Sequence, residues 1–187
     1  TELIGNRADQ DGGGLWVAGA LSYQGGLVRD NIAGRNGGGV VVGFEPFATT
    51  PVPGGCDCAD VRFEGNTAQT GSGGGMYLTQ TSSLSRMAFL DNQAGRDGGA
   101  LNQALIHLTI ENPIVIADSL FSRNRAGVRP ESYGIGGAMA IGKHLTLLRS
   151  RLEENQASSG GAVAIRDILT WMEIRESRLA GNVATEY

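Results

Sequence analysis

The chain has 187 residues and a formal net charge of −4, and 41% of its residues are hydrophobic, which is enough for a buried core. Lys143 is the only lysine and basic residues form no cluster, which excludes the electrostatic pattern of a nucleic-acid-binding protein. No apolar run approaches the roughly 18 residues of a membrane-spanning helix, and the first residues form no charged-then-apolar leader.

A short motif recurs seven times along the chain. It consists of an apolar residue, two variable residues, Asn, one variable residue and Ala, and its asparagines are Asn6, Asn31, Asn66, Asn92, Asn124, Asn155 and Asn182. A block of two glycines, a small residue and an apolar residue follows six of these copies. Successive asparagines are 25 to 35 residues apart, a period typical of solenoids, propellers and repeat arrays.

Each repeat is expected to begin with a strand that leads into the Asn motif. In the sixth copy, for example, the interior positions are Leu145 and Leu147, two residues apart. A second strand is expected after the glycine block, where Met139 and Ile141 again lie two residues apart. This period of two predicts strands and not helices, and we expect a third short strand in each repeat.

The repeat length decides between the repeat architectures. Glycine disfavours a helix interior by roughly 1 kcal/mol per residue, and a propeller blade needs about 40–45 residues and four strands. We therefore predict an all-β fold, a single-stranded right-handed parallel β-helix (β-solenoid) of about six to seven coils of roughly 25–35 residues. Residues 1–187 are expected to form one β-helix domain that is a processed product or a segment of a longer protein.

The recurrent Asn and Gly are expected to form the corners of the coils. Asn tolerates left-handed backbone geometry and bonds its own neighbouring backbone, and Gly takes positive φ at no steric cost. Stacked coils place equivalent side chains about 4.8 Å apart. The seven asparagines are therefore expected to form a hydrogen-bonded ladder, and Phe63, Phe89 and Phe121 an apolar stack.

Three insertions interrupt the period, at 43–55, 103–113 and 128–135. Loops extruded from a repeat commonly lie on the functional face. The first insertion is rich in proline and contains Phe44 and Phe47.

An outward stripe is expected beside the first insertion. Trp16, Val41 and Tyr77 stand between the two interior columns of the second strand, so their side chains should point outward. Exposed apolar patches often mark contacts with partners or sugars. We therefore expect a ligand or partner surface made of Trp16, Val41, Tyr77, Phe44 and Phe47. The alternative is that the insertion covers the stripe.

Cys56 and Cys58 align with interior columns that elsewhere hold leucine and isoleucine. Free cysteine behaves as a small buried hydrophobe, which favours a pair of buried thiols. A disulfide between the two is the first alternative and a metal site the second. The only histidines, His107 and His144, are far away in sequence, so we expect no metal and no cofactor.

Acidic residues offer the main pattern compatible with catalysis. Many β-helical carbohydrate-active enzymes use carboxylate clusters on one outer face for calcium binding or acid–base work. Asp60 and Asp118 share an outward column with Arg86 between them, and Asp30 and Asp91 share another. Alternation with arginine is more typical of a solvated, charge-balanced face, so we expect no enzyme.

The recurrent motifs of this chain resemble those of a known family. Two alternating motifs occur along the chain. One is Phe63-Glu64-Gly65-Asn66, Phe89-Leu90-Asp91-Asn92 and Phe121-Ser122-Arg123-Asn124, and the other is Gly98-Gly99-Ala100-Leu101, Gly136-Gly137-Ala138-Met139 and Gly160-Gly161-Ala162-Val163. They resemble the Phe-x-x-Asn and Gly-Gly-Ala-apolar repeats of polymorphic outer-membrane proteins. The resemblance implies a β-helical passenger of a bacterial surface or autotransporter protein. It implies an extracellular or cell-surface location and a role in adhesion or display. In the first two copies Leu3 and Val28 replace the phenylalanine.

We therefore expect an extracellular structural or adhesive module that acts as a rigid rod and displays loops. One alternative is a self-assembling filament subunit whose copies stack end to end, and another is a carbohydrate-active β-helix of the polysaccharide lyase or hydrolase type. The expected partners are further copies of the chain, through open β-helix ends, or a host or surface receptor or glycan. Neither nucleic-acid binding nor direct membrane insertion is expected.

Overall fold

The computed structural model describes residues 1–43, 55–104, 113–129, 132–166 and 171–185. These residues form 24 β-strands and contain no helix, so the all-β prediction is confirmed for this part of the chain. Parts of all three predicted insertions lie outside the described residues. They are most of the insertion at 43–55, with Phe44 and Phe47, and parts of the insertions at 103–113 and 128–135.

The strands form three sheets whose neighbours all run parallel. The 11-stranded sheet contains β1 (Glu2–Ile4), β4 (Leu21–Arg29), β7 (Cys56–Glu64), β10 (Ser82–Ser85), β11 (Ala88–Leu90), β14 (Ile114–Ala117), β15 (Leu120–Ser122), β18 (Leu145–Leu148), β19 (Arg151–Glu153), β22 (Met172–Arg175) and β23 (Arg178–Ala180). The seven-stranded sheet contains β2 (Arg7–Ala8), β5 (Ile32–Ala33), β8 (Thr67–Ala68), β12 (Gln93–Ala94), β16 (Arg125–Ala126), β20 (Gln156–Ala157) and β24 (Val183–Ala184). The six-stranded sheet contains β3 (Leu15–Val17), β6 (Val40–Val42), β9 (Met76–Leu78), β13 (Leu101–Gln103), β17 (Met139–Ile141) and β21 (Val163–Ile165).

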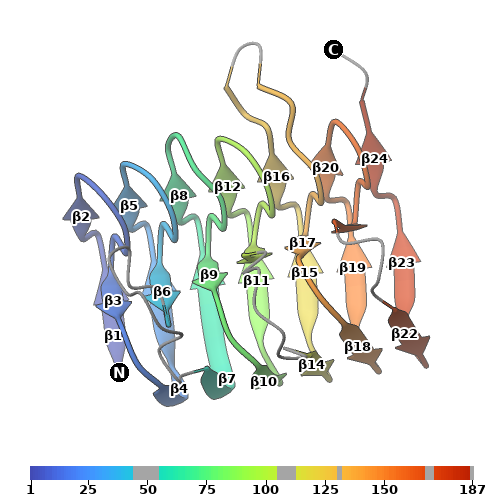
Figure 1. Cartoon of the computed structure of the whole chain (residues 1–187), viewed down its shortest axis with the longest axis horizontal. Helices are drawn as coiled ribbons and strands as arrows, with labels where there is room; N and C mark the ends of the chain where they lie inside the picture. The colour runs from blue at the N-terminus through green and yellow to red at the C-terminus, as the bar shows by residue number, and fades with distance from the viewer. Residues whose placement is uncertain (44–54, 105–112, 130–131, 167–170, 186–187) are drawn as a thin grey trace.

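The chain visits the three sheets in turn and then repeats the path. We call one such passage a rung; the described residues form rungs at 1–17, 21–42, 56–78, 82–103, 114–141, 145–165 and 172–184. Each strand pairs with its counterparts in adjacent rungs, so that the rungs lie side by side from the N-terminus to the C-terminus (Figure 1). The result is a β-solenoid-like stack of parallel sheets.

The left-handed corners lie one residue away from the predicted asparagines. The residue before the Asn has positive φ in several rungs, as in Asp30 (54°), Asp91 (55°) and Arg123 (54°). The Asn itself is absent from the positive-φ residues, and its side chain bonds the neighbouring rung. The prediction that the Asn takes the left-handed geometry and bonds its own backbone is therefore wrong, because the preceding residue makes the bend and leaves the Asn amide pointing inward.

A second left-handed corner divides the long first strand. Asp60 bends β7 at φ 58°, and Arg86 separates β10 from β11 at φ 50°. The strands on either side of the bend at Arg86, β10 and β11, both pair with the bent strand β7. The 11-stranded sheet therefore turns at this corner. Each rung therefore encloses an interior on several sides.

The interior is a continuous apolar column. Phe63, Phe89 and Phe121 are fully buried, and successive rings stack with centroids 4.8 Å apart, as predicted. The glycine block lets neighbouring rungs approach closely, because a Cβ on Gly99 would lie 2.3 Å from the carbonyl oxygen of Gly137. The recurrent Phe and Gly of the repeat thus set the interior packing and the spacing of the rungs.

The last rung differs from the middle ones. Its interior positions are open to solvent, with Met172 45% and Leu179 43% exposed, whereas Leu145 and Leu152 in the preceding rung are fully buried. Burial therefore comes from neighbouring rungs, as expected for a stacked repeat.

Candidate functional site

The predicted stripe lies on the outer side of the six-stranded sheet. Trp16 pairs with Val41 and Val41 with Tyr77, so the three share one column. Trp16 is 42% exposed and Tyr77 is half-buried, but Val41 is fully buried. The turn before β6 covers Val41, since a Cβ on Gly37 would lie 2.4 Å from Val41 Cγ2. A continuous exposed stripe is therefore not formed at Val41.

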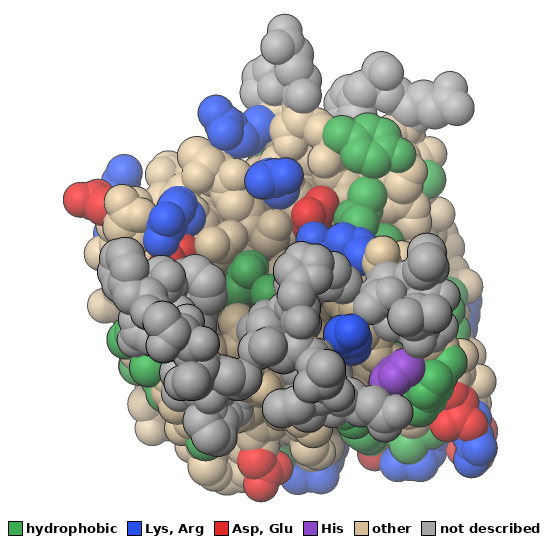
Figure 2. Space-filling view, in the orientation of Figure 1, with side chains coloured by type: hydrophobic (Ala, Val, Ile, Leu, Met, Phe, Trp, Pro, Cys, Tyr) green, Lys and Arg blue, Asp and Glu red, His purple; other side chains and the backbone are tan. Residues whose placement is uncertain are grey.

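A hollow of about 450 Å³ lies beside this column, over β9 and β13. Its lining includes Asn36, Tyr77, Arg96, Asp97, Asn102 and Arg166. The lining side chains come from the turns that lead into the sheet and from the outer faces of its strands. Figure 2 shows this face of the molecule, where basic and acidic side chains gather next to the apolar ones.

A polar ladder runs along the turns that border the hollow. Asp11 Oδ1 accepts from the backbone N–H of Asn36 (3.0 Å), and Asn36 Oδ1 accepts from that of Ser72 (3.0 Å). Ser72 Oγ accepts from the N–H of Asp97 (3.3 Å), and Asp97 Oδ1 accepts from that of Ile135 (3.2 Å). Each side chain satisfies a backbone donor in the following rung, which fixes the wall of the hollow.

Arg166 closes one end of the hollow. It follows β21, and its guanidinium reaches Asp97 Oδ2 (3.0 Å), Asn102 Oδ1 (2.6 Å) and the carbonyl oxygen of Gln103 (3.0 Å). Arg166 lies two rungs beyond Asn102, and the small side chains of Ala140 and Ala164 occupy the column of Asn102 in the next two rungs. The arginine therefore holds the amide of the buried Asn102 in one orientation.

Within the described part of the chain, the charges around the hollow leave one cation without an ion-pair partner. Arg35 pairs with Asp11 and Arg166 pairs with Asp97. Among the described residues, the exposed guanidinium of Arg96 has no ion pair or hydrogen bond. Counted over the described residues, three arginines and two aspartates give the hollow a local charge of +1.

Tyr77 forms part of the floor of the hollow. Burial raises the pKa of the Tyr77 phenol, and the charge of Arg166 partly offsets this effect. The phenol is therefore neutral near pH 7, and its aromatic ring lines the hollow.

The carboxylates singled out in the sequence lie elsewhere, on the corners of the rungs. Asp60 accepts from both Nε and Nη2 of Arg86 at 2.7 Å, and Asp118 accepts in the same way from Arg149 at 2.7 and 2.8 Å. The hydrogen bond from the paired arginine lowers the pKa of Asp60 and of Asp118. These side chains form an alternating charged column.

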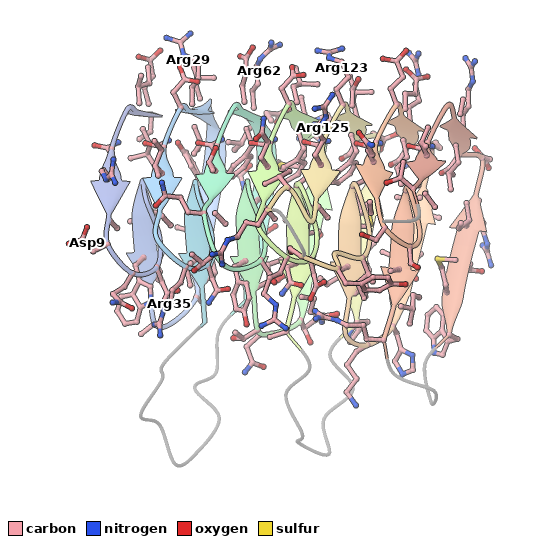
Figure 3. The ribbon with its side chains drawn as sticks, turned by 90° about the horizontal axis from the view of Figure 1, so that it is seen from above. Asp9, Arg29, Arg35, Arg62, Arg123 and Arg125 are labelled. Carbon is pink, nitrogen blue, oxygen red and sulfur yellow. A yellow bond between two sulfur atoms is a disulfide. The ribbon has the colours of Figure 1, made fainter. Side chains whose placement is uncertain are left out.

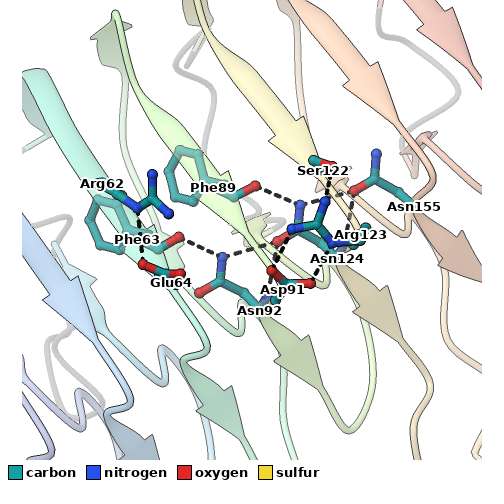
Figure 4. Close-up of polar contacts among 10 residues, drawn as sticks. All are labelled: Arg62, Phe63, Glu64, Phe89, Asp91, Asn92, Ser122, Arg123, Asn124 and Asn155. Carbon is teal, nitrogen blue, oxygen red and sulfur yellow. Dashed lines mark hydrogen bonds and ion pairs between the residues drawn. The ribbon is translucent and has the colours of Figure 1, made fainter.

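A second charged column runs beside the first. Asp91 accepts from Nε and Nη2 of Arg123 at 2.8 Å (Figure 4). Asp30 pairs instead with Arg29. Figure 3 shows Arg29, Arg62 and Arg123 in a row along one side of the molecule, with Arg35 on the opposite side. The hollow and the charged columns are therefore separate surfaces.

The predicted Asn ladder runs inside these corners. Every Asn from Asn6 to Asn155 donates through its backbone N–H and its Nδ2 to Oδ1 of the next one, at 2.8–3.1 Å. The second Nδ2 hydrogen of Asn92 bonds the carbonyl oxygen of Phe63 (3.0 Å), as Figure 4 shows. The asparagines of the middle rungs are fully buried. They are structural residues.

The two cysteines are joined by a disulfide inside the third rung. Both are buried, and they pair with Leu21 and Tyr23 on one side. Cys58 pairs with Leu84 on the other. Of the three interpretations open from the sequence, the structure has the disulfide and not the favoured thiol pair, because alternate strand residues face the same interior.

The remaining candidates for metal or acid–base chemistry do not converge in the described residues. His144 is buried and stacks on Trp171 with ring centroids 4.9 Å apart, and its Nδ1 accepts from the backbone N–H of Trp171 (3.1 Å). His107 lies outside the described residues. No group of three His, Cys, Asp or Glu suited to a metal ion occurs within the part of the chain that the structure describes.

Sequence reasoning missed Arg96, Asn102 and Arg166 as members of one site. The position before each glycine block, held by Asp11, Asn36, Ser72 and Asp97, was the available signal for the polar ladder. No comparable signal marks Arg166, because its contacts depend on a reach across two rungs to Asn102.

Comparison with protein-family models, with curated proteins and with solved structures finds no match for this chain. Within the described residues, no helix is long and apolar enough to cross a membrane.

Proposed function

We propose that this chain is a single-stranded right-handed parallel β-helix that serves as an extracellular structural or adhesive module of a bacterial surface protein. It acts as a stiff rod that presents the hollow over β9 and β13 to a receptor or glycan. The resemblance of its repeats to those of polymorphic outer-membrane proteins supports this setting.

The observation that carries the proposal is the unbroken Asn ladder from Asn6 to Asn182. Buried hydrogen bonds in a low-dielectric interior resist opening, because a lost partner leaves a costly unsatisfied group. A ladder that joins every rung therefore makes the stack stiff along its axis. Stiffness suits a spacer that holds a binding face away from a surface.

The carboxylates support a non-enzymatic role over the carbohydrate-active alternative. Asp60, Asp91 and Asp118 are each bound by two nitrogens of an arginine in the next rung. A glycosidase needs two carboxylates flanking one bond, with one of them kept protonated by a raised pKa. Pairing with arginine instead lowers the pKa of Asp60 and Asp118.

The Cys56–Cys58 disulfide supports the extracellular location. Disulfides persist in oxidising environments such as the cell exterior and the bacterial periplasm, and they are rare in the cytosol.

Surface adhesion tests the proposal. Beads coated with the folded protein should adhere to glycan-bearing cells, and beads coated with an Asn92→Ala variant, whose rod is destabilised, should adhere less. Gln93→Ala is the matched control, since Gln93 is the exposed neighbour of Asn92. Release of new sugar ends from a panel of polysaccharides, or equal adhesion of uncoated beads, would contradict the proposal.

A filament subunit is the second candidate, and the direction of the ladder favours it. Each Asn donates toward the C-terminal side, so Asn6 Oδ1 and the N–H of Asn182 are complementary groups at opposite ends. The partly exposed Leu179 offers an apolar face to a further rung. Head-to-tail contacts of this kind generate open filaments. Sedimentation velocity tests it: self-association that rises with concentration and disappears in Leu179→Arg is expected, and a monomer at all concentrations would contradict it.

A further inference from the structure

The hollow over β9 and β13 carries groups that the stacking of rungs does not require. Arg96 projects an exposed guanidinium that has no partner among the described residues. Asn102 is held in place by Arg166, and Tyr77 lies in the adjoining rung of the same column. A cation, an oriented amide and an aromatic side chain thus line one cavity.

We propose that this hollow binds an acidic saccharide, with the sugar carboxylate on Arg96 and the sugar ring over Tyr77. The inference rests on the proposed function, because it names the class of ligand that the displayed face takes. A uronic acid unit within a longer glycan is the chemical type that fits.

The charge arrangement selects a single carboxylate. A guanidinium presents a planar fork of donors that matches a carboxylate, and the bond is strengthened by the opposite charges. Arg35 and Arg166 are already engaged by Asp11 and Asp97, so Arg96 supplies the unpaired charge among the residues that the structure describes. A net charge of +1 suits a monoanion, whereas phosphate sites commonly gather several cations or backbone donors.

The fixed polar groups favour a sugar over an acidic peptide. Asn36 and Asp97 belong to the polar ladder, and Asn102 is bound by Arg166, so their positions are set before a ligand arrives. Sugar hydroxyls match such closely spaced amide and carboxylate groups, and an aromatic side chain packs against the apolar face of a sugar ring. The only aliphatic side chain among the described lining residues is that of Ala104, which offers little to an apolar peptide side chain. The volume of about 450 Å³ lies within the usual range for small-ligand sites.

A titration followed by nuclear magnetic resonance tests the ligand class. Methyl glucuronide should shift the side-chain amide signals of Asn36 and Asn102 and the ring signals of Tyr77. Methyl glucoside, which lacks the carboxylate, should bind about tenfold more weakly because it loses a charge-assisted contact. Acetyl-glutamate amide, which has a carboxylate but no sugar ring, should also bind about tenfold more weakly.

Two arginine variants locate the carboxylate. Arg96→Gln should weaken glucuronide binding about tenfold. Arg125→Gln, which removes the same charge from an exposed arginine away from the hollow, should leave binding unchanged (Figure 3). Thermal melting of both variants should match the parent protein, because neither guanidinium has a partner among the described residues.

Three results would overturn the inference. They are equal binding of glucuronide and glucoside, equal loss in Arg96→Gln and Arg125→Gln, and shifts that leave Asn36, Asn102 and Tyr77 unperturbed. Bead adhesion that persists alongside any of these results would reject the acidic sugar as ligand and leave the rod proposal intact. Loss of adhesion by the parent protein itself would reject the rod proposal instead.

Discussion

Two columns of residues run along the same corner of the rungs, the buried Asn ladder and an exposed column beside it. The buried ladder holds Asn in all seven copies, whereas the exposed column just before it holds Gly, Asp, Arg and Glu in different rungs. Both repeat with the same rung spacing, so geometry alone does not explain the difference. The buried position holds only Asn because each unsatisfied buried amide costs free energy. At the exposed position water can satisfy polar groups, so several residue types occur there.

Removal of one buried asparagine is expected to have the largest effect. Asn92→Ala deprives the backbone N–H and Nδ2 of Asn66 and the carbonyl oxygen of Phe63 of their partners. Each orphaned buried group costs roughly 1–3 kcal/mol, so the free energy of unfolding should fall by about 3–5 kcal/mol. Urea denaturation measures it, with Gln93→Ala, expected within about 0.5 kcal/mol of the parent, as the control. A loss below about 1 kcal/mol would show that the ladder is not the main constraint.

The aromatic stack beside the ladder tests whether apolar contacts are equally demanding. Phe89→Leu gives up two stacked ring contacts, with Phe63 and Phe121, each worth about 0.5–1.5 kcal/mol. The expected loss is about 1–3 kcal/mol in the same denaturation assay. Leu152→Met, in the same column, should cost less than about 1.5 kcal/mol. If the two substitutions cost the same, the rings would contribute nothing beyond their volume.

The predictability of the fold follows the same division. The alternating apolar residues predicted the strands, and the recurrent buried Asn and Phe predicted the ladder and the stack, because interior chemistry allows few substitutes. The left-handed corners were placed one residue off, since Asp91 and Arg123 lack the glycine signal that Gly65 gives in the same column. The hollow was not predicted. Tyr77 was named only as part of an outward stripe, and the positions of Arg96 and Arg166 depend on side-chain reach and on turn geometry that no local pattern encodes.

Substitutions of Arg123, at the exposed corner, distinguish the effect of backbone strain from that of charge pairing. Arg123 has φ 54°, a region that costs a residue with a Cβ roughly 1–2 kcal/mol. Arg123→Gly relieves that cost while it loses the pair with Asp91, so its net effect should be within about 0.5 kcal/mol of zero. Arg123→Val keeps a Cβ, adds β-branching and loses the pair, so it should destabilise by about 1–2 kcal/mol. Equal stability of the two variants would mean that the corner geometry carries no cost.

The smallest expected effect is the contribution of an exposed ion pair, which the pH dependence of Asp60→Asn isolates. Arg86 lowers the pKa of Asp60 in the folded protein. A lowered carboxyl pKa contributes stability above the unfolded value of 3.8, and this contribution disappears as the pH falls through the folded pKa. The variant should therefore melt slightly below the parent protein near about pH 6, and the two melting curves should converge near about pH 2.5.

Salt distinguishes this exposed pair from the buried ladder. Addition of about 1 M NaCl near about pH 6 should reduce the difference between parent and Asp60→Asn, because the screening length falls to roughly 3 Å. The deficit of Asn92→Ala should persist, since its lost hydrogen bonds are buried. A deficit of Asp60→Asn that survives both acid and salt would assign the stabilisation to the corner geometry of Asp60, at φ 58°, and not to its charge.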